Sequence, residues 1–133
     1  MIADQALKAG VKHYVYTSVE GAERKTGVPH FDTKWLVEEH IRKIGIPYTI
    51  LRPVCFMNNF TTPGMFGKVS TGFFQHYVKA PKKLQLIATS DIGKMAAITL
   101  QVASFPARVF GFSLEKIRLA PRRVQGSGDF LGR

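Results

Sequence analysis

The chain has 133 residues, 45% of them hydrophobic, which is enough for one folded core and too few for two domains of ordinary size. No apolar stretch approaches the roughly 18 residues of a transmembrane helix, and the N-terminus lacks the apolar segment of a secretory signal. The single cysteine, Cys55, excludes an internal disulfide and favours a reducing, intracellular setting. The formal net charge of +10 is spread along the sequence and follows no helix face, so direct nucleic-acid binding is not expected.

The first part of the chain alternates between helical and strand patterns. Residues 2–9 predict a short amphipathic helix closed by Gly10, and residues 11–19 predict a largely apolar strand. A second helix is expected over residues 29–44, because a proline opens it and a glycine follows it, and a second strand over residues 46–53. A helix of this length between two strands indicates a parallel crossover, so the predicted class is α/β.

A shorter strand and a third helix follow later in the chain. Residues 84–89, "LQLIAT", predict the strand, and residues 90–104 predict the helix. Ser90 or Asp91 is the expected N-cap, because a short polar side chain there can accept a hydrogen bond from a free backbone N–H.

Two segments show no clear periodicity. Residues 54–83 are rich in Phe, Met and Gly, and either cover a pocket or serve only in packing. From residue 105 onward the sequence is basic and contains several glycines, which predicts a poorly ordered tail. The expected organisation is therefore one domain over residues 1–104 and an irregular basic tail over residues 105–133.

The helix expected over residues 29–44 has one apolar side. The expected buried residues are Phe31, Trp35, Val37, Ile41 and Ile44, with Glu38, Glu39, Arg42 and Lys43 outside. His30 and Lys34 lie one turn apart on the face that also carries Val37 and Ile41.

In a right-handed crossover the N-terminus of the helix lies near the carboxyl ends of both strands. His30 and Lys34 are therefore expected over a crevice, beside Thr17 and Ser18 on one side and residues 53–56 on the other. The alternative is that Lys34 extends to solvent and His30 only caps the helix.

Three stretches together resemble the NmrA-like family of atypical short-chain dehydrogenase/reductases, which includes fungal nitrogen-regulation proteins. They are "AGVKHYVYTSV", "HFDTKWLVEEHIRKIGIPYTILRPVCFMNNF" and "LQLIATSDIGKMAA", and the resemblance covers roughly residues 2–103. It implies a partial Rossmann-like parallel sheet with flanking helices, and an NAD(P)-binding site at the carboxyl ends of its strands.

The resemblance also implies roles for individual residues. Lys34 matches the lysine that hydrogen-bonds the nicotinamide ribose in reductase relatives, and His30 stands where those relatives carry a catalytic tyrosine. The implied cofactor-binding residues are Thr17, Ser18, Val19, Lys34, Pro53, Val54, Cys55 and Phe56. Asn59 could also touch the ligand, and Asp91 is expected to be structural.

Two departures from the family pattern bear on the chemistry. The glycine-rich G-x-x-G-x-x-G turn, which brings backbone N–H groups to a pyrophosphate, does not occur in the sequence. The chain thus resembles a member that lacks its N-terminal half. The second departure is His30, because a neutral imidazole is a poorer proton donor to a carbonyl than a tyrosine whose pKa a lysine lowers.

The resemblance therefore implies an NAD(P)(H)-binding regulatory or redox-sensing protein, or a truncated fragment of one, without efficient hydride transfer. The alternative is an NAD(P)H-dependent reductase of the isoflavone-reductase-like type, acting on a small carbonyl or unsaturated substrate. A third alternative is a product without selected activity. The implied cofactor is NADP, the implied partner is a protein such as a transcription regulator, and the implied compartment is the cytoplasm or the nucleus.

Other candidate sites have weaker patterns. His13, His40 and His76 lie apart without carboxylate spacing, so no metal site is expected. A hydrolase triad of Ser18, His30 and an acidic residue is not expected, because no G-x-S-x-G turn accompanies these residues. Cys55 is expected to be a semi-buried thiol, because nothing near it in sequence would lower its pKa.

Overall fold

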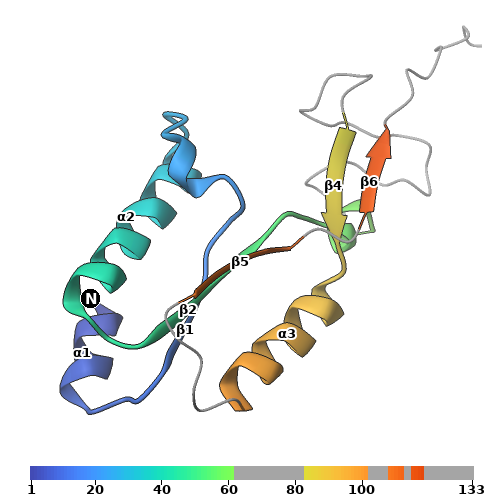
Figure 1. The fold of residues 1–133 in the computed structure, drawn as a ribbon. Coiled ribbons are helices and arrows are strands. Elements are labelled where there is room, and N and C mark those ends of the chain that lie inside the picture. Colours follow the sequence, from blue (N-terminus) through green and yellow to red (C-terminus); the bar gives the residue numbers. More distant parts are fainter. Residues whose placement is uncertain (62–82, 102–107, 113–114, 119–133) are drawn as a thin grey trace, which may run out of the picture.

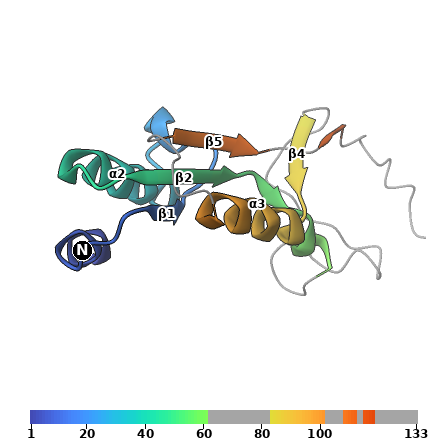
Figure 2. The same cartoon turned by 60° about the horizontal axis from the view of Figure 1, so that its bottom comes forward.

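The computed structural model describes residues 1–61, 83–101, 108–112 and 115–118, and it contains two three-stranded sheets. Helices lie on both sides of the first sheet, with α1 and α2 on one side and α3 on the other (Figures 1 and 2). Within the described residues, no helix is long and apolar enough to cross a membrane.

The first sheet begins with a helix–strand–helix–strand unit. Its elements are α1 (Ile2–Lys8), β1 (Tyr14–Thr17), the short 3-10 helix η1 (Ala22–Arg24), α2 (Pro29–Ile44) and β2 (Tyr48–Pro53). The predicted bounds of α2 are confirmed: Pro29 opens it, and Gly45 ends it in the left-handed conformation with φ of 73°. β1 is shorter than the predicted strand.

β2 is the centre of this sheet, between β1 and β5 (Arg108–Phe112). β1 pairs with β2 in parallel, with Tyr14 opposite Tyr48, and β5 pairs with β2 in parallel, with Thr49 opposite Arg108. The predicted parallel α/β class is confirmed.

The second sheet lies beyond the carboxyl end of β2 (Figure 1). It contains β3 (Cys55–Phe56), β4 (Lys83–Ile87) and β6 (Glu115–Arg118), with β4 parallel to β3 and antiparallel to β6. The prediction that the chain is irregular from residue 105 onward is wrong for β5 and β6, because each forms a strand with a partner elsewhere. Residues 119–133 lie outside the described residues, as does most of the 54–83 segment.

The third helix, α3 (Thr89–Gln101), begins before the predicted N-cap residues. Ser90 and Asp91 lie inside its first turn, and Asp91 pairs with Lys94 at 3.0 Å. The cap comes from Asn58 in η2 (Met57–Phe60), whose Oδ1 accepts hydrogen bonds from the Thr89 N–H at 3.3 Å and its hydroxyl at 2.9 Å. A capping residue so far away in sequence also fixes η2 against α3.

The core lies between α1, α2 and the sheet. Ala3, Ile41 and Ile46 form its buried centre, and Ile50 and Leu51 of β2 are fully buried. Two histidines lie beside this core and are held by hydrogen bonds: His13 to Thr49 and His40 to Asp4. His76 lies outside the described residues.

Candidate functional site

Lys34 lies at the carboxyl end of β1. Its Nζ donates a hydrogen bond to the Thr17 carbonyl oxygen at 3.0 Å and lies 5.1 Å from the centre of the Tyr16 ring. The ammonium group therefore lies at the carboxyl end of β1, as expected for the first turns of a helix in a right-handed crossover. Its other two N–H donors have no partner among the described residues, so they can reach a hydroxyl or an anion.

His30 occupies the first turn of α2 and is exposed. The centres of the His30 and Phe31 rings lie 5.5 Å apart in an edge-to-face arrangement. Among the described residues, no hydrogen bond links His30 to Lys34. The two residues share an end of the helix, but the structure does not join them as a catalytic pair. Their predicted roles in catalysis stay predictions.

The ends of β1 and β2 are held together by backbone hydrogen bonds. The N–H of Ser18 donates to the Leu51 carbonyl at 2.7 Å, and the N–H of Glu20 donates to the Pro53 carbonyl at 3.0 Å. Ser18 and Pro53 are buried, while Thr17 is exposed and Val19 is half-buried. The predicted cofactor-binding residues around the ends of β1 and β2 therefore lie together at the carboxyl end of the sheet.

Cys55 and Phe56 belong to β3, so they lie at the junction between the two sheets. Val54, between β2 and β3, is half-buried. Burial raises the pKa of the Cys55 thiol, although the Asn59 amide, 4.0 Å from its Sγ, acts in the opposite direction. Burial therefore makes this thiol less ready to ionise than an exposed cysteine.

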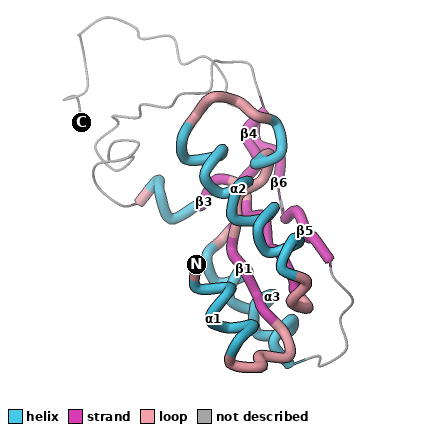
Figure 3. Tube along the Cα trace, turned by 90° about the vertical axis from the view of Figure 1, so that its left-hand side faces the viewer, coloured by secondary structure: helices cyan, strands magenta, loops and turns pink. Residues whose placement is uncertain are grey.

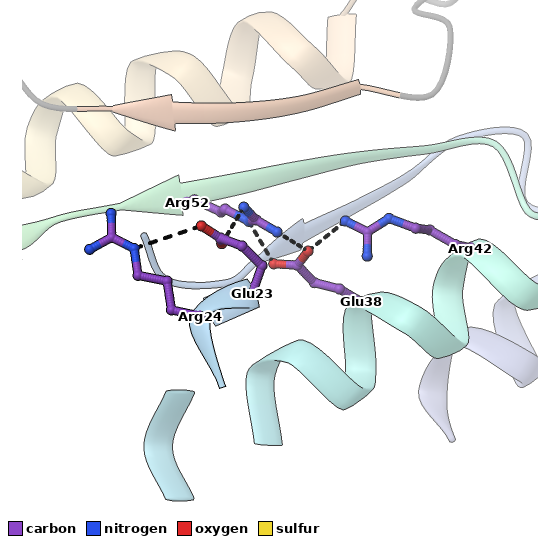
Figure 4. A network of polar contacts seen from close by, with 5 residues as sticks. All are labelled: Glu23, Arg24, Glu38, Arg42 and Arg52. Carbon is purple, nitrogen blue, oxygen red and sulfur yellow. Dashed lines mark hydrogen bonds and ion pairs between the residues drawn. The ribbon is translucent and has the colours of Figure 1, made fainter. Parts of the chain in front are cut away.

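Next to the carboxyl ends of β1 and β2 lies a network of charged side chains that was not predicted from the sequence (Figure 4). Glu38 of α2 was expected to be exposed, but its side chain is fully buried. Arg52 of β2 donates two hydrogen bonds to it, from Nε at 2.9 Å and from Nη2 at 2.7 Å, and Arg42 donates a third at 2.7 Å. A carboxylate can be buried here because two guanidinium groups replace its water.

The network extends to η1 and to an aromatic ring. Arg52 also bonds Glu23 of η1 at 2.7 Å, and Glu23 lies 3.9 Å from Arg24 (Figure 4). The guanidinium carbons of Arg42 and Arg52 lie 4.9 Å and 5.7 Å from the centre of the Trp35 ring. Because Arg52 stands in β2 and Glu38 stands one turn after Lys34, the network fixes α2, and with it Lys34, against the sheet.

The ionisation of Glu38 reflects two opposing effects. Burial alone would raise its pKa, but the hydrogen bonds from Arg52 and Arg42 outweigh burial and hold the pKa below its ordinary value of 4.5. The Ser18 hydroxyl also faces this carboxylate, at a geometry outside the usual limits of a hydrogen bond. Glu38 is therefore ionised throughout the neutral range.

Acid should weaken the fold through Glu38. A carboxyl group whose pKa is lowered in the folded state stabilises it at pH values above the unfolded pKa, and loses this effect as the pH falls through the folded pKa. We expect the free energy of unfolding in urea to fall as the pH is lowered from 6 past about 4.5, and Glu38→Gln to make this fall shallower. Some slope should remain, because the N-terminal amino group and His40 also lower the pKa of Asp4. An equally steep fall in Glu38→Gln would contradict this assignment.

A comparison with known proteins shows which family the chain resembles. The NmrA-like family model matches residues 1–116. A relative, the nitrogen metabolite repression protein nmr of Neurospora crassa, is 42% identical over 65 residues, which are 46% of this chain and 13% of that protein. Another, agroclavine dehydrogenase of Claviceps fusiformis, is 34% identical over 96 residues, which are 70% of this chain and 32% of that protein.

A solved structure agrees on the fold. The Bordetella bronchiseptica enzyme WbmG in complex with NAD superposes with a TM-score of 0.64 and 20% identity, over 88% of this chain and 43% of that one. The chain thus spans less than half the length of these relatives. Because the family model covers most of the sequence, including both strands and the crossover helix that carries Lys34, the chain belongs to the NmrA-like family.

Proposed function

We propose that this chain forms the nicotinamide side of an NAD(P)(H)-binding regulatory module and does not carry out efficient hydride transfer. The observation that carries the proposal is the position of Lys34, whose ammonium group lies over the end of β1 with two N–H donors free among the described residues. A ribose offers two neighbouring hydroxyl groups, which accept hydrogen bonds from such a donor.

The residues at this edge suit binding better than proton transfer. Glu38 and Arg52 hold α2 in place, so that Lys34 can orient a ligand. His30 is exposed and has no hydrogen bond to Lys34 among the described residues, so it is not held as a general acid. A bound nicotinamide would supply the hydride chemistry. This chain would orient it through Lys34 and through the ends of β1 and β2, which are held together by backbone hydrogen bonds.

Two similarities support the regulatory reading and the choice of ligand. The Neurospora crassa relative is a nitrogen metabolite repression protein, and the structural neighbour WbmG holds NAD. We propose NADP(H) as the ligand, a protein such as a transcription regulator as the partner, and the cytoplasm or nucleus as the compartment. Affinity should be low, because the sequence has no glycine-rich turn to hold the pyrophosphate.

Calorimetric titration of NADPH and NADP⁺ into the 133-residue chain tests this proposal. We expect a Kd on the order of 1 mM, which corresponds to about −4 kcal/mol, and at least a tenfold weakening in Lys34→Ala. Lys43→Ala is the matched control, because it removes the same charge from the exposed last turn of the same helix. Absence of binding at about 10 mM, or an equal weakening in both variants, would overturn the proposal.

The second candidate function is a reductase, favoured by the similarity to agroclavine dehydrogenase. It predicts NADPH oxidation, followed by its absorbance, in the presence of a small carbonyl or unsaturated substrate. It also predicts that Lys34→Ala abolishes this oxidation while Lys43→Ala retains it. Binding without oxidation supports the regulatory module over the reductase.

A further inference from the structure

The strands β4 and β6 form an antiparallel pair in which the charged residues are sorted by face. The two strands lie side by side in the second sheet (Figures 1 and 3). Lys83 stands opposite Arg118, and Gln85 stands opposite Lys116. Directly opposite residues of an antiparallel pair share a face, and so do alternate residues of one strand. These four positions therefore belong to one face, which we call the basic face.

The other face has a different composition. Leu84 stands opposite Ile117 and Leu86 stands opposite Glu115, and both leucines are buried. Glu115 is the one acidic residue in the two strands, and its register position places it with this apolar set. The basic face thus has three cationic residues and no carboxylate at its four positions.

The arrangement of the basic face is unfavourable for the strand pair alone. A lysine directly opposite an arginine destabilises the pair, because the two like charges repel each other. Lys83 is exposed and forms no ion pair within the described part of the chain. Ile87, two residues beyond Gln85, is buried, so the basic face is open at the Lys83 end of β4. A bound anion would remove the repulsion.

We propose that the basic face binds an extended acidic segment of a partner polypeptide, with glutamate or aspartate at alternate positions. Alternate residues of an extended chain lie about 7 Å apart, which matches the spacing of alternate residues along β4 and β6. Carboxylates spaced in this way can form charge-assisted hydrogen bonds with the cations of both strands. The inference rests on the proposed function only for the existence of a protein partner, and it specifies the chemistry of that partner.

Charge and composition select this occupant. The chain carries a formal net charge of +10, so it attracts an acidic segment and repels a second copy of itself. Single-stranded nucleic acid binds by stacking its bases on aromatic side chains, and no position of the basic face is aromatic. An acidic polypeptide needs no such platform, because its charged groups lie on its side chains.

Three probes test this surface on the ¹⁵N-labelled 133-residue chain. The first is a capped eight-residue peptide that alternates glutamate with threonine. The second has the same composition but groups its four glutamates together, which divides them between the two sides of an extended strand. The third is an oligothymidine of five nucleotides without terminal phosphates, which carries the same number of negative charges. Binding is followed at low ionic strength by NMR at the amides of Lys83, Gln85, Lys116 and Arg118.

We expect the alternating peptide to bind at least threefold more tightly than the grouped peptide, and its binding to weaken as salt is added. The double variant Lys83→Gln with Arg118→Gln should bind it at least tenfold more weakly. Lys8→Gln with Lys43→Gln is the matched control, because it gives the same net charge by changing the last turns of α1 and α2. This control should retain the affinity within about twofold.

A third variant separates binding from folding. Lys83→Glu places opposite charges across the strand pair, an arrangement that stabilises it, so this variant should give an unchanged far-UV circular dichroism spectrum. It should nevertheless bind the alternating peptide at least tenfold more weakly, because its new carboxylate repels the peptide and neutralises Arg118.

Three results would overturn the proposal. Equal binding of the two peptides would show that the basic face does not recognise alternate carboxylates. Equal losses in the two double variants would show that affinity depends on net charge alone. Oligothymidine binding as tight as that of the alternating peptide would identify nucleic acid as the occupant. Because no probe is a dinucleotide, each of these results is independent of the NADPH titration.

Discussion

Glu38→Gln is expected to lower the free energy of unfolding by about 3 kcal/mol, measured by urea denaturation at pH 7. The substitution keeps the size of the side chain but leaves Arg52, whose side chain is only 12% exposed, without its buried counter-charge. The loss should lie at the lower end of the range for broken buried pairs, because Glu23 still contacts Arg52.

Glu39→Gln is the matched control, because Glu39 is the next residue of the same helix and is exposed. Its effect should stay within about 0.5 kcal/mol. A double variant with Glu38→Leu and Arg52→Met should recover much of the loss, since a well-packed apolar pair can replace a buried ion pair. If Glu38→Gln costs no more than Glu39→Gln, the network does not hold α2 to the sheet.

Ile41→Ala is expected to destabilise the chain by about 3 kcal/mol in the same measurement. Ile41 is completely buried between α1 and the sheet, in the cluster with Ala3 and Ile46. Removing its side-chain carbons loses their transfer free energy and leaves a cavity that the rigid surroundings fill only in part.

Leu36→Ala provides the contrast, because Leu36 lies on the same helix and is 62% exposed. Its cost should stay below about 1 kcal/mol. Ile41→Val, which removes a single methyl group, should fall between the two at about 1 kcal/mol. The packing described for α2 would be wrong if the three variants did not rank in this order.

The helix that carries the site could be predicted because its signals are local. Pro29 and Gly45 mark its two ends, and the spacing of Val37 and Ile41 marks the face toward the sheet. The position of Lys34 near Thr17 then follows from the handedness of the crossover, without any knowledge of side-chain contacts.

The features that the sequence analysis missed depend on distant partners. Glu38 is buried because Arg52, on another element, supplies its counter-charge, while periodicity alone places a glutamate outside. An arginine within an otherwise apolar strand was the available signal, since it needs an acidic partner. In the same way β5 contains Gly111 and follows no clear period, and its strand conformation comes from pairing with β2.

The topology of the first sheet also sets an order of assembly. β1 and β2 are joined by the single helix α2, whereas β5 reaches β2 only after the chain has passed through β3, β4 and α3. Closing the longer connection costs more chain entropy, and contacts between distant residues form slowly. We therefore expect the segment from α1 to β2, which contains both Lys34 and the Glu38–Arg52 pair, to form before β5 joins the sheet.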